Sequence, residues 1–106
     1  MKKFQITLYE YSHNQFSVAG RLIDGDIHIN EVFNQIHHYV HQPEEWTLHM
    51  TYSVALRISS IIAYSRHLDF LSESMTAQLD LEVEKFDVWE QYYTDFESGM
   101  FMLVQS

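Results

Sequence analysis

The chain has 106 residues, which is enough for one domain and too few for two. Hydrophobic residues make up 46% of it and aromatic residues 15%, so a packed core is expected and a disordered chain is excluded. The formal net charge of −9 disfavours nonspecific binding to nucleic acid, and the absence of cysteine excludes disulfides, thiolate zinc sites and cysteine nucleophiles.

Apolar and polar residues alternate along the first third of the chain. An alternation with a period of two is typical of strands that are buried on one face. The pattern predicts strands over 4–8, 16–22 and 27–29, with turns over 12–15 and 24–26. Gly25 in the second turn tolerates the positive φ that tight turns require.

The segment 32–41 is ambiguous from its pattern. Val32, Phe33, Ile36 and Val40 have the spacing of a helix, but the same residues could continue an extended chain. We favour extended structure here, followed by a turn over 42–45 that contains the single proline.

Alternation returns in the second half. It predicts strands over 46–52, 54–58, 61–64, 75–81 and 100–104, a loop over 66–69, and a short helix or loop near 84–93. A bulge is expected between the second and third of these strands. Strands that recur every 8–14 residues predict an all-β, mostly antiparallel fold. We expect one domain over 1–106, built as a small closed or partly open β-barrel.

The order of these elements resembles domain 2 of translational GTPases such as elongation factor Tu. The segment 18–32 matches that family's strand, turn and strand at Gly20, Gly25, Ile27, Ile29, Glu31 and Val32. Asn30 replaces the second turn glycine, a mild change because asparagine also adopts left-handed backbone geometry. The segments 54–64, 66–69, 75–81 and 98–103 resemble the later strands, with Ser98 in place of an arginine, so the likeness covers nearly the whole chain.

The resemblance implies a barrel without chemistry of its own, which in the family packs against a GTPase and helps to hold RNA or a protein. This sequence has no G-x-x-x-x-G-K-[ST] phosphate loop, so it resembles the barrel as a stand-alone domain. The family's basic, RNA-facing character is also missing. The resemblance therefore implies a fold, and no functional residue is transferred with it.

Histidine is the most suggestive residue type, with seven in the chain. On a helix, His37 and His41 would share a face and could chelate a divalent metal, whereas on a strand they would share a face at a larger separation. A third ligand would have to come from His28 or His49. The alternatives are surface histidines, which we favour, or a pH-dependent surface. We expect neither a metal nor another cofactor.

Other catalytic patterns are weak. Carboxylates occur in pairs at 24/26, 44/45 and 82/84, but nothing in the sequence places two of them in one cleft, as acid–base chemistry would require. Serines and histidines are numerous enough to pair by coincidence, and no G-x-S-x-G motif is present. We therefore do not expect an enzyme.

The best binding candidate is the acidic, aromatic segment 86–96. Tryptophan and tyrosine dominate protein interfaces because they bury a large area and keep a polar group, and flanking carboxylates attract a basic partner. The predicted partner-binding residues are Asp87, Trp89, Glu90, Tyr92, Tyr93 and Asp95. The alternative is that aromatic residues of this segment, Phe86 and Phe96 above all, fill the end of the barrel as core.

Charge is concentrated in the same region. From Asp69 to the last residue there are nine acids and one base, Lys85, a net charge of −8 over 38 residues. Such a surface either keeps a protein soluble, which is the commoner reason, or suits a basic protein partner.

No targeting or membrane segment is predicted. Met1, Lys2 and Lys3 are followed by alternating polar residues, so we expect no signal peptide. The longest apolar runs are far shorter than the roughly 18 residues of a membrane span. The absence of cysteine fits a reducing compartment, and we expect a cytoplasmic protein.

These observations together favour a non-enzymatic protein-binding module. Its most concrete form is a small acidic protein that docks on a basic protein, as an immunity protein docks on a toxin. The alternative is a translation- or RNA-associated accessory domain, which would need a local basic patch. The residues available for such a patch are Lys2, Lys3, Arg21, Arg57 and Arg66.

Overall fold

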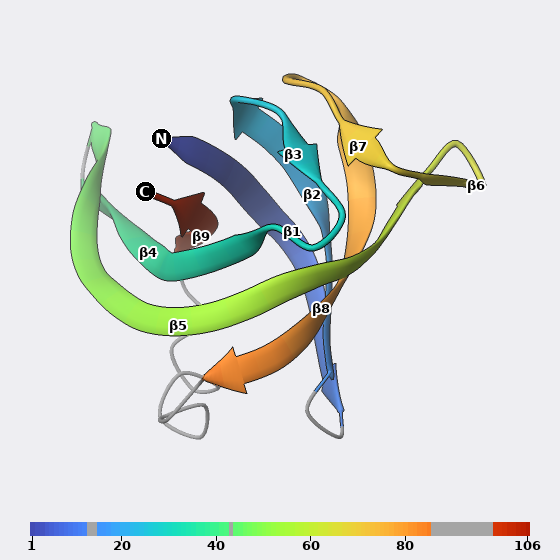
Figure 1. Ribbon diagram of the computed structural model, residues 1–106. Helices are drawn as coiled ribbons and strands as arrows, with labels where there is room; N and C mark the ends of the chain where they lie inside the picture. The colour runs from blue at the N-terminus through green and yellow to red at the C-terminus, as the bar shows by residue number, and fades with distance from the viewer. Residues whose placement is uncertain (13–14, 43, 86–98) are drawn as a thin grey trace.

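The computed structural model describes residues 1–106 except 13–14, 43 and 86–98 (Figure 1). Its elements are strands throughout: β1 (Lys2–Ser12), β2 (Gln15–Asp24), β3 (Ile27–His28), β4 (Val32–Gln42), β5 (Glu45–Ala63), β6 (Arg66–Leu68), β7 (Phe70–Leu71), β8 (Thr76–Lys85) and β9 (Met100–Gln105). All of their pairings are antiparallel. The predicted all-β, antiparallel class is therefore confirmed.

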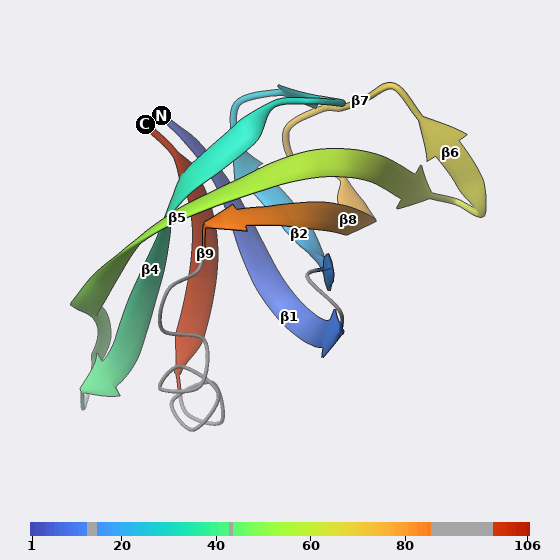
Figure 2. The same ribbon diagram turned by 60° about the horizontal axis from the view of Figure 1, so that its bottom comes forward.

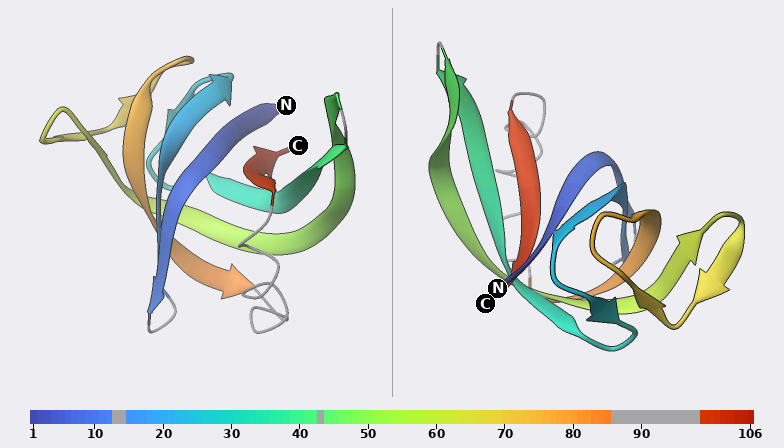
Figure 3. Two further views of the ribbon diagram at one scale, coloured as in Figure 1. Left: turned by 180° about the vertical axis from the view of Figure 1, so that it is seen from behind. Right: turned by 90° about the horizontal axis from the view of Figure 1, so that it is seen from above.

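The main sheet returns to its first strand. Its order is β4-β9-β1-β2-β8-β5-β6, and β4 also pairs with β5, so six strands form a ring (Figure 2). Strand β6 extends the sheet beyond this ring, and β3 and β7 form a separate two-stranded sheet. The view from above shows the β4–β5 hairpin and the β5–β6 hairpin at opposite sides of the molecule (Figure 3).

The core forms because alternate residues of each strand point inward. In β2, every second residue from Phe16 to Leu22 is buried, Gly20 included, while Ser17, Ala19 and Arg21 between them are more exposed. In β8, Leu79 and Leu81 meet Val18 and Phe16 directly across the ladder. These side chains belong to one hydrophobic cluster to which the ring strands contribute.

Two turn predictions are confirmed at the backbone level. Gly25 has a φ of 80°, and Asn30 has a φ of 74°, so asparagine does adopt the left-handed conformation in place of glycine. The Asn30 N–H donates to the Ile58 carbonyl and the Ile58 N–H donates to the Glu31 carbonyl, which fixes this turn against β5.

Segment 32–41 is extended, as we favoured, because it pairs with β5 on one side and β9 on the other. The three strands predicted over 46–64 are one strand, β5. Register shifts opposite β8, between Ala55 and Leu56 and between Ile58 and Ser60, interrupt the apolar pattern without breaking the strand.

Two predictions need correction. The loop expected over 66–69 is wrong for Arg66–Leu68, because these residues form β6 by pairing with the extended end of β5. The short helix or loop expected near 84–93 is wrong at its start, where residues 84 and 85 end β8 and Lys85 pairs with Ala55. The rest of that range lies outside the described residues.

Candidate protein-binding surface

The hairpin of β4 and β5 projects beyond the rest of the ring, at the left of Figure 1. The residues from Glu45 to Thr51 are all exposed, on both faces of the strand. Trp46 keeps 49% of its surface exposed and Leu48 keeps 47%, although both are large and apolar. Scattered exposed apolar residues are ordinary, but neighbours on one surface indicate an interaction site.

The strand register shows which side chains share this surface. In an antiparallel pair, residues directly opposite each other project to the same face. His41 is opposite Trp46, and Tyr39 is opposite both Leu48 in β5 and Met100 in β9. We call the resulting surface the hairpin face; it consists of His37, Tyr39, His41, Trp46, Leu48, Met100 and Met102.

The hairpin face has internal contacts that hold its side chains in place. The rings of His41 and Trp46 meet edge to face with centroids 5.1 Å apart, and those of His37 and Tyr39 are 6.3 Å apart. The Gln5 side-chain amide donates to the Met100 sulfur at 3.0 Å. Ordered aromatic rings lose little entropy when a partner covers them, which favours binding.

His38 points to the opposite face, so the histidine cluster is divided by the pleat. Its ring stacks on Phe101 with centroids 4.3 Å apart and an angle of 7°. The His49 ring approaches the His38 ring edge-on, with centroids 5.4 Å apart. A register shift between β4 and β5 leaves His49 without an opposite residue in β4. His38 therefore acts as part of the core rather than as a member of the surface.

His37 is buried between its neighbours on the hairpin face. Its Nε2–H donates to the Gln35 amide oxygen at 3.0 Å, and its Nδ1 has no hydrogen-bond partner among the residues that the structure describes. Burial, together with the positive charge of Lys3, lowers the pKa of His37. The ring therefore stays neutral more readily than a free histidine.

The metal interpretation gains no support from this geometry. Four residues along a strand span about 13 Å, which is too far for His37 and His41 to bind one ion. In the described parts of the chain, no three residues among histidine, aspartate and glutamate gather as metal ligands. His28 lies on β3, where its ring stacks on Phe70 at 5.8 Å, and His49 lies on the hairpin.

The predicted partner-binding residues Asp87, Trp89, Glu90, Tyr92, Tyr93 and Asp95 lie outside the described residues, so that assignment stays a prediction. The hairpin face was not predicted from the sequence. Alternation over 46–52 indicated a half-buried strand, and the same alternation occurs in a strand that projects into solvent. No local signal separates the two cases.

The basic patch that RNA binding would require is partly neutralised. The Arg57 guanidinium contacts Glu82 at 2.6 Å and Glu84 at 3.0 Å, and these contacts raise its pKa. Lys2 contacts Glu31 at 2.6 Å. Two of the five cations expected for the patch are therefore ion-paired, which weighs against a phosphate-binding surface.

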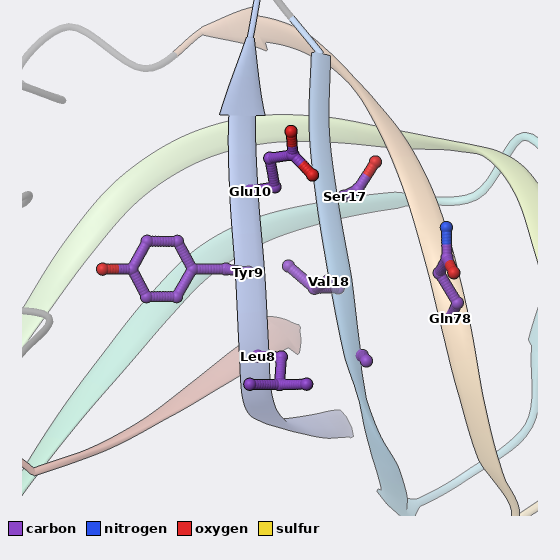
Figure 4. A pocket seen from close by; sticks show the side chains of 7 residues that line it. Leu8, Tyr9, Glu10, Ser17, Val18 and Gln78 are labelled. Atoms are coloured by element: carbon purple, nitrogen blue, oxygen red, sulfur yellow. The ribbon is translucent and has the colours of Figure 1, made fainter.

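A shallow groove of about 220 Å³ lies over β1 and β2 (Figure 4). Glu10 and Ser17 point into the same region, while the Tyr9 ring is directed away from them. Glu10 is the groove's one carboxylate, and the Ser17 hydroxyl donates to Asp80 at 2.9 Å. Acid–base catalysis needs two matched groups in one cleft, and this groove supplies one.

Comparison with protein families, with curated proteins and with solved structures gives no match for this chain. In the described residues, no helix has the length and apolar character that crossing a membrane requires.

Proposed function

We propose that this chain is a non-enzymatic protein-binding domain and that the hairpin face is its docking surface. The observation that carries the proposal is the exposure of Trp46 and Leu48 side by side with Tyr39 and the methionines of β9. Tryptophan, tyrosine and methionine are enriched at the centres of protein interfaces. Methionine also adapts its shape to a partner.

The partner that we propose is basic. The chain carries a net charge of −9, with fifteen aspartates and glutamates against six lysines and arginines. A negative surface speeds the association of a positive partner. An immunity-type inhibitor of a toxin is the concrete form of this proposal, with the cytoplasm as its location.

The ring of six antiparallel strands also supports the proposed likeness to domain 2 of translational GTPases. The turn at Asn30, with its φ of 74°, supports it as well, because the family pattern has a glycine there. The likeness concerns architecture, so it adds no function to the proposal.

The test begins with capture of the tagged chain from its native cells and identification of bound proteins. Each candidate is then purified and its affinity measured by calorimetry against the wild type and the double variant Trp46→Ala/Leu48→Ala. We expect a basic partner whose binding weakens tenfold or more, because interface aromatics dominate affinity. Raising the salt concentration should slow its association.

Leu8→Ala is the matched control. Leu8 is 71% exposed but lies on β1, away from the hairpin. It should leave affinity unchanged. Equal affinity of the double variant and the wild type would show that the hairpin face is not the docking surface.

A further inference from the structure

Strands β6 and β7 lie at the side of the molecule away from the β4–β5 hairpin (Figure 3). A second recess lies between β6, β7 and the start of β8. Its volume is about 420 Å³, within the roughly 300–1,000 Å³ that ligand sites occupy. The lining residues are His67, Leu68, Asp69, Phe70, Ser72 and Met75.

The backbone around this recess is held from both sides. Strand β7 pairs with β3 through Ile27 and Leu71 and through His28 and Phe70. The Ile29 N–H donates to the Asp69 carbonyl at 3.1 Å, and the Met75 N–H donates to the Ser72 carbonyl at 3.2 Å. The recess is therefore formed before any ligand arrives, which lowers the entropic cost of binding.

Apolar side chains line part of the recess. Leu68 and Met75 are partly buried and pack against the main core. Phe70 is 51% exposed, and the His28 ring stacks near it at 5.8 Å. An aromatic ring that remains half exposed offers a surface on which a planar cation can lie.

Polar groups complete the lining. The Asp69 carboxylate is exposed and has neither an ion pair nor a hydrogen bond with any described residue, although its backbone is fixed. The Ser60 hydroxyl lies 3.3 Å from His67 Nδ1, which orients that ring. The recess thus combines an apolar wall, an aromatic ring and an unpaired negative charge.

We propose that this recess binds an arginine side chain of a protein partner. The methylene groups would pack on Leu68 and Met75, the guanidinium would lie against Phe70, and its N–H groups would donate to the Asp69 carboxylate. The assignment of the side chain to a protein rests on the proposed function. The recess itself is separate from the hairpin face, so either site can fail alone.

Arg66 is the nearby charge that opposes this binding. It is exposed, lies two residues before Leu68 on β6, and has no ion pair within the described part of the chain. Its positive charge raises the cost of bringing a second cation to Asp69. Removing it should therefore strengthen binding, whereas removing the Asp69 charge should weaken it.

The experiment titrates the ¹⁵N-labelled chain with N-acetyl-arginine amide and follows backbone amide shifts by NMR. We expect saturating shifts confined to residues 67–75 and to residues 27–29, which pair with β7 or bond to the Asp69 carbonyl. N-acetyl-citrulline amide has nearly the same shape without the charge, and it should bind about tenfold more weakly because charge-assisted hydrogen bonds are lost. This probe needs no partner, so its result does not depend on the proposed function.

Three variants sharpen the test. Asp69→Asn should weaken binding of N-acetyl-arginine amide about tenfold, and Arg66→Gln should strengthen it about twofold, by loss and gain of electrostatic attraction. Asp24→Asn removes one exposed charge elsewhere and should change nothing. Equal binding of arginine and citrulline, an equal effect of Asp24→Asn and Asp69→Asn, or shifts spread over the acidic surface would each overturn the proposal.

Discussion

At Gly20 the backbones of β1 and β2 approach so closely that a side chain has no room. A Cβ at this position would stand 1.8 Å from the Gln5 carbonyl oxygen, and backbone cannot move aside as a flexible side chain can. The position is buried and its φ is not positive, so the requirement for glycine here is one of space rather than of conformation.

Gly20→Ala should therefore destabilise the fold by about 1–3 kcal/mol, as overpacking of a core does. Urea denaturation of both proteins measures the difference in the free energy of unfolding. Gly25→Asn is the matched control. A Cβ at this position would stand 2.8 Å from Lys2 Cγ, but the lysine side chain can move aside. Asparagine also accepts the φ of 80° found here. A loss for Gly20→Ala no larger than for Gly25→Asn would contradict the steric argument.

Residue identity predicted some backbone conformations and missed others. Asn30 was expected to be left-handed because asparagine forms local hydrogen bonds in that conformation, and it is. Tyr64 and Ser65 also have positive φ values, 54° and 61°, but neither residue type indicates them. There the pairing of β5 with β6 selects the turn, and pairing between strands is not a local property of the sequence.

At the level of elements, the turn between β5 and β6 adopts a backbone conformation that its two residues do not favour. Ala63 pairs with Arg66, which leaves two residues to reverse the chain. Two-residue hairpin turns with positive φ at both positions strongly prefer Asn-Gly. Tyr64 is 80% exposed, so little packing compensates for its conformation.

The double variant Tyr64→Asn/Ser65→Gly should stabilise the protein by about 1 kcal/mol. Left-handed geometry costs residues other than glycine and asparagine roughly 1–2 kcal/mol each. Part of the stabilisation is lost because glycine increases the conformational entropy of the unfolded chain. Thermal unfolding should show a higher midpoint. An unchanged or lower midpoint would mean that the Tyr64 ring contributes contacts that outweigh the backbone cost.

Element prediction succeeded where one face of a strand is buried. Alternation found β1, β2, β8 and β9, because each carries apolar residues at every second position against the core. It failed for β6, whose three residues are extended only because the end of β5 pairs with them. It also could not distinguish the projecting start of β5 from a packed strand, so the hairpin face was not foreseen.

For the molecule as a whole, the spacing of strands and turns predicted antiparallel character and a closed or partly open barrel, but it did not predict which strands close the ring. Closure depends on β9 lying between β1 and β4 and on β4 pairing with β5. These are contacts between segments distant in sequence. The ion pair of Lys2 with Glu31 acts at the same scale, because it joins the first strand to the turn before β4.

Glu31 should make stability depend on acid. Burial acts to raise its pKa, but the hydrogen bond from the Lys2 ammonium and that from the His28 N–H outweigh it, so the pKa lies below its ordinary 4.5. The unfolded chain then binds a proton at a higher pH than the folded chain does. The ionised Glu31 carboxylate therefore stabilises the fold above pH 4.5, and this stabilisation is lost as the pH falls through the pKa of Glu31 in the folded state.

Lys2→Met should bring the pKa of Glu31 closer to its unfolded value and reduce the slope of stability against pH below 4.5. It should also cost about 0.5–1 kcal/mol at neutral pH, as partly exposed ion pairs do. Urea denaturation between pH 3 and pH 7 measures both effects. Lys3→Met removes the same charge from the neighbouring residue, which has no ion pair among the described residues, so it corrects for the general effect of charge on an acidic molecule. If Lys2→Met and Lys3→Met reduce the slope of stability against pH below 4.5 by the same amount, the acid dependence comes from net charge and not from the Lys2–Glu31 contact.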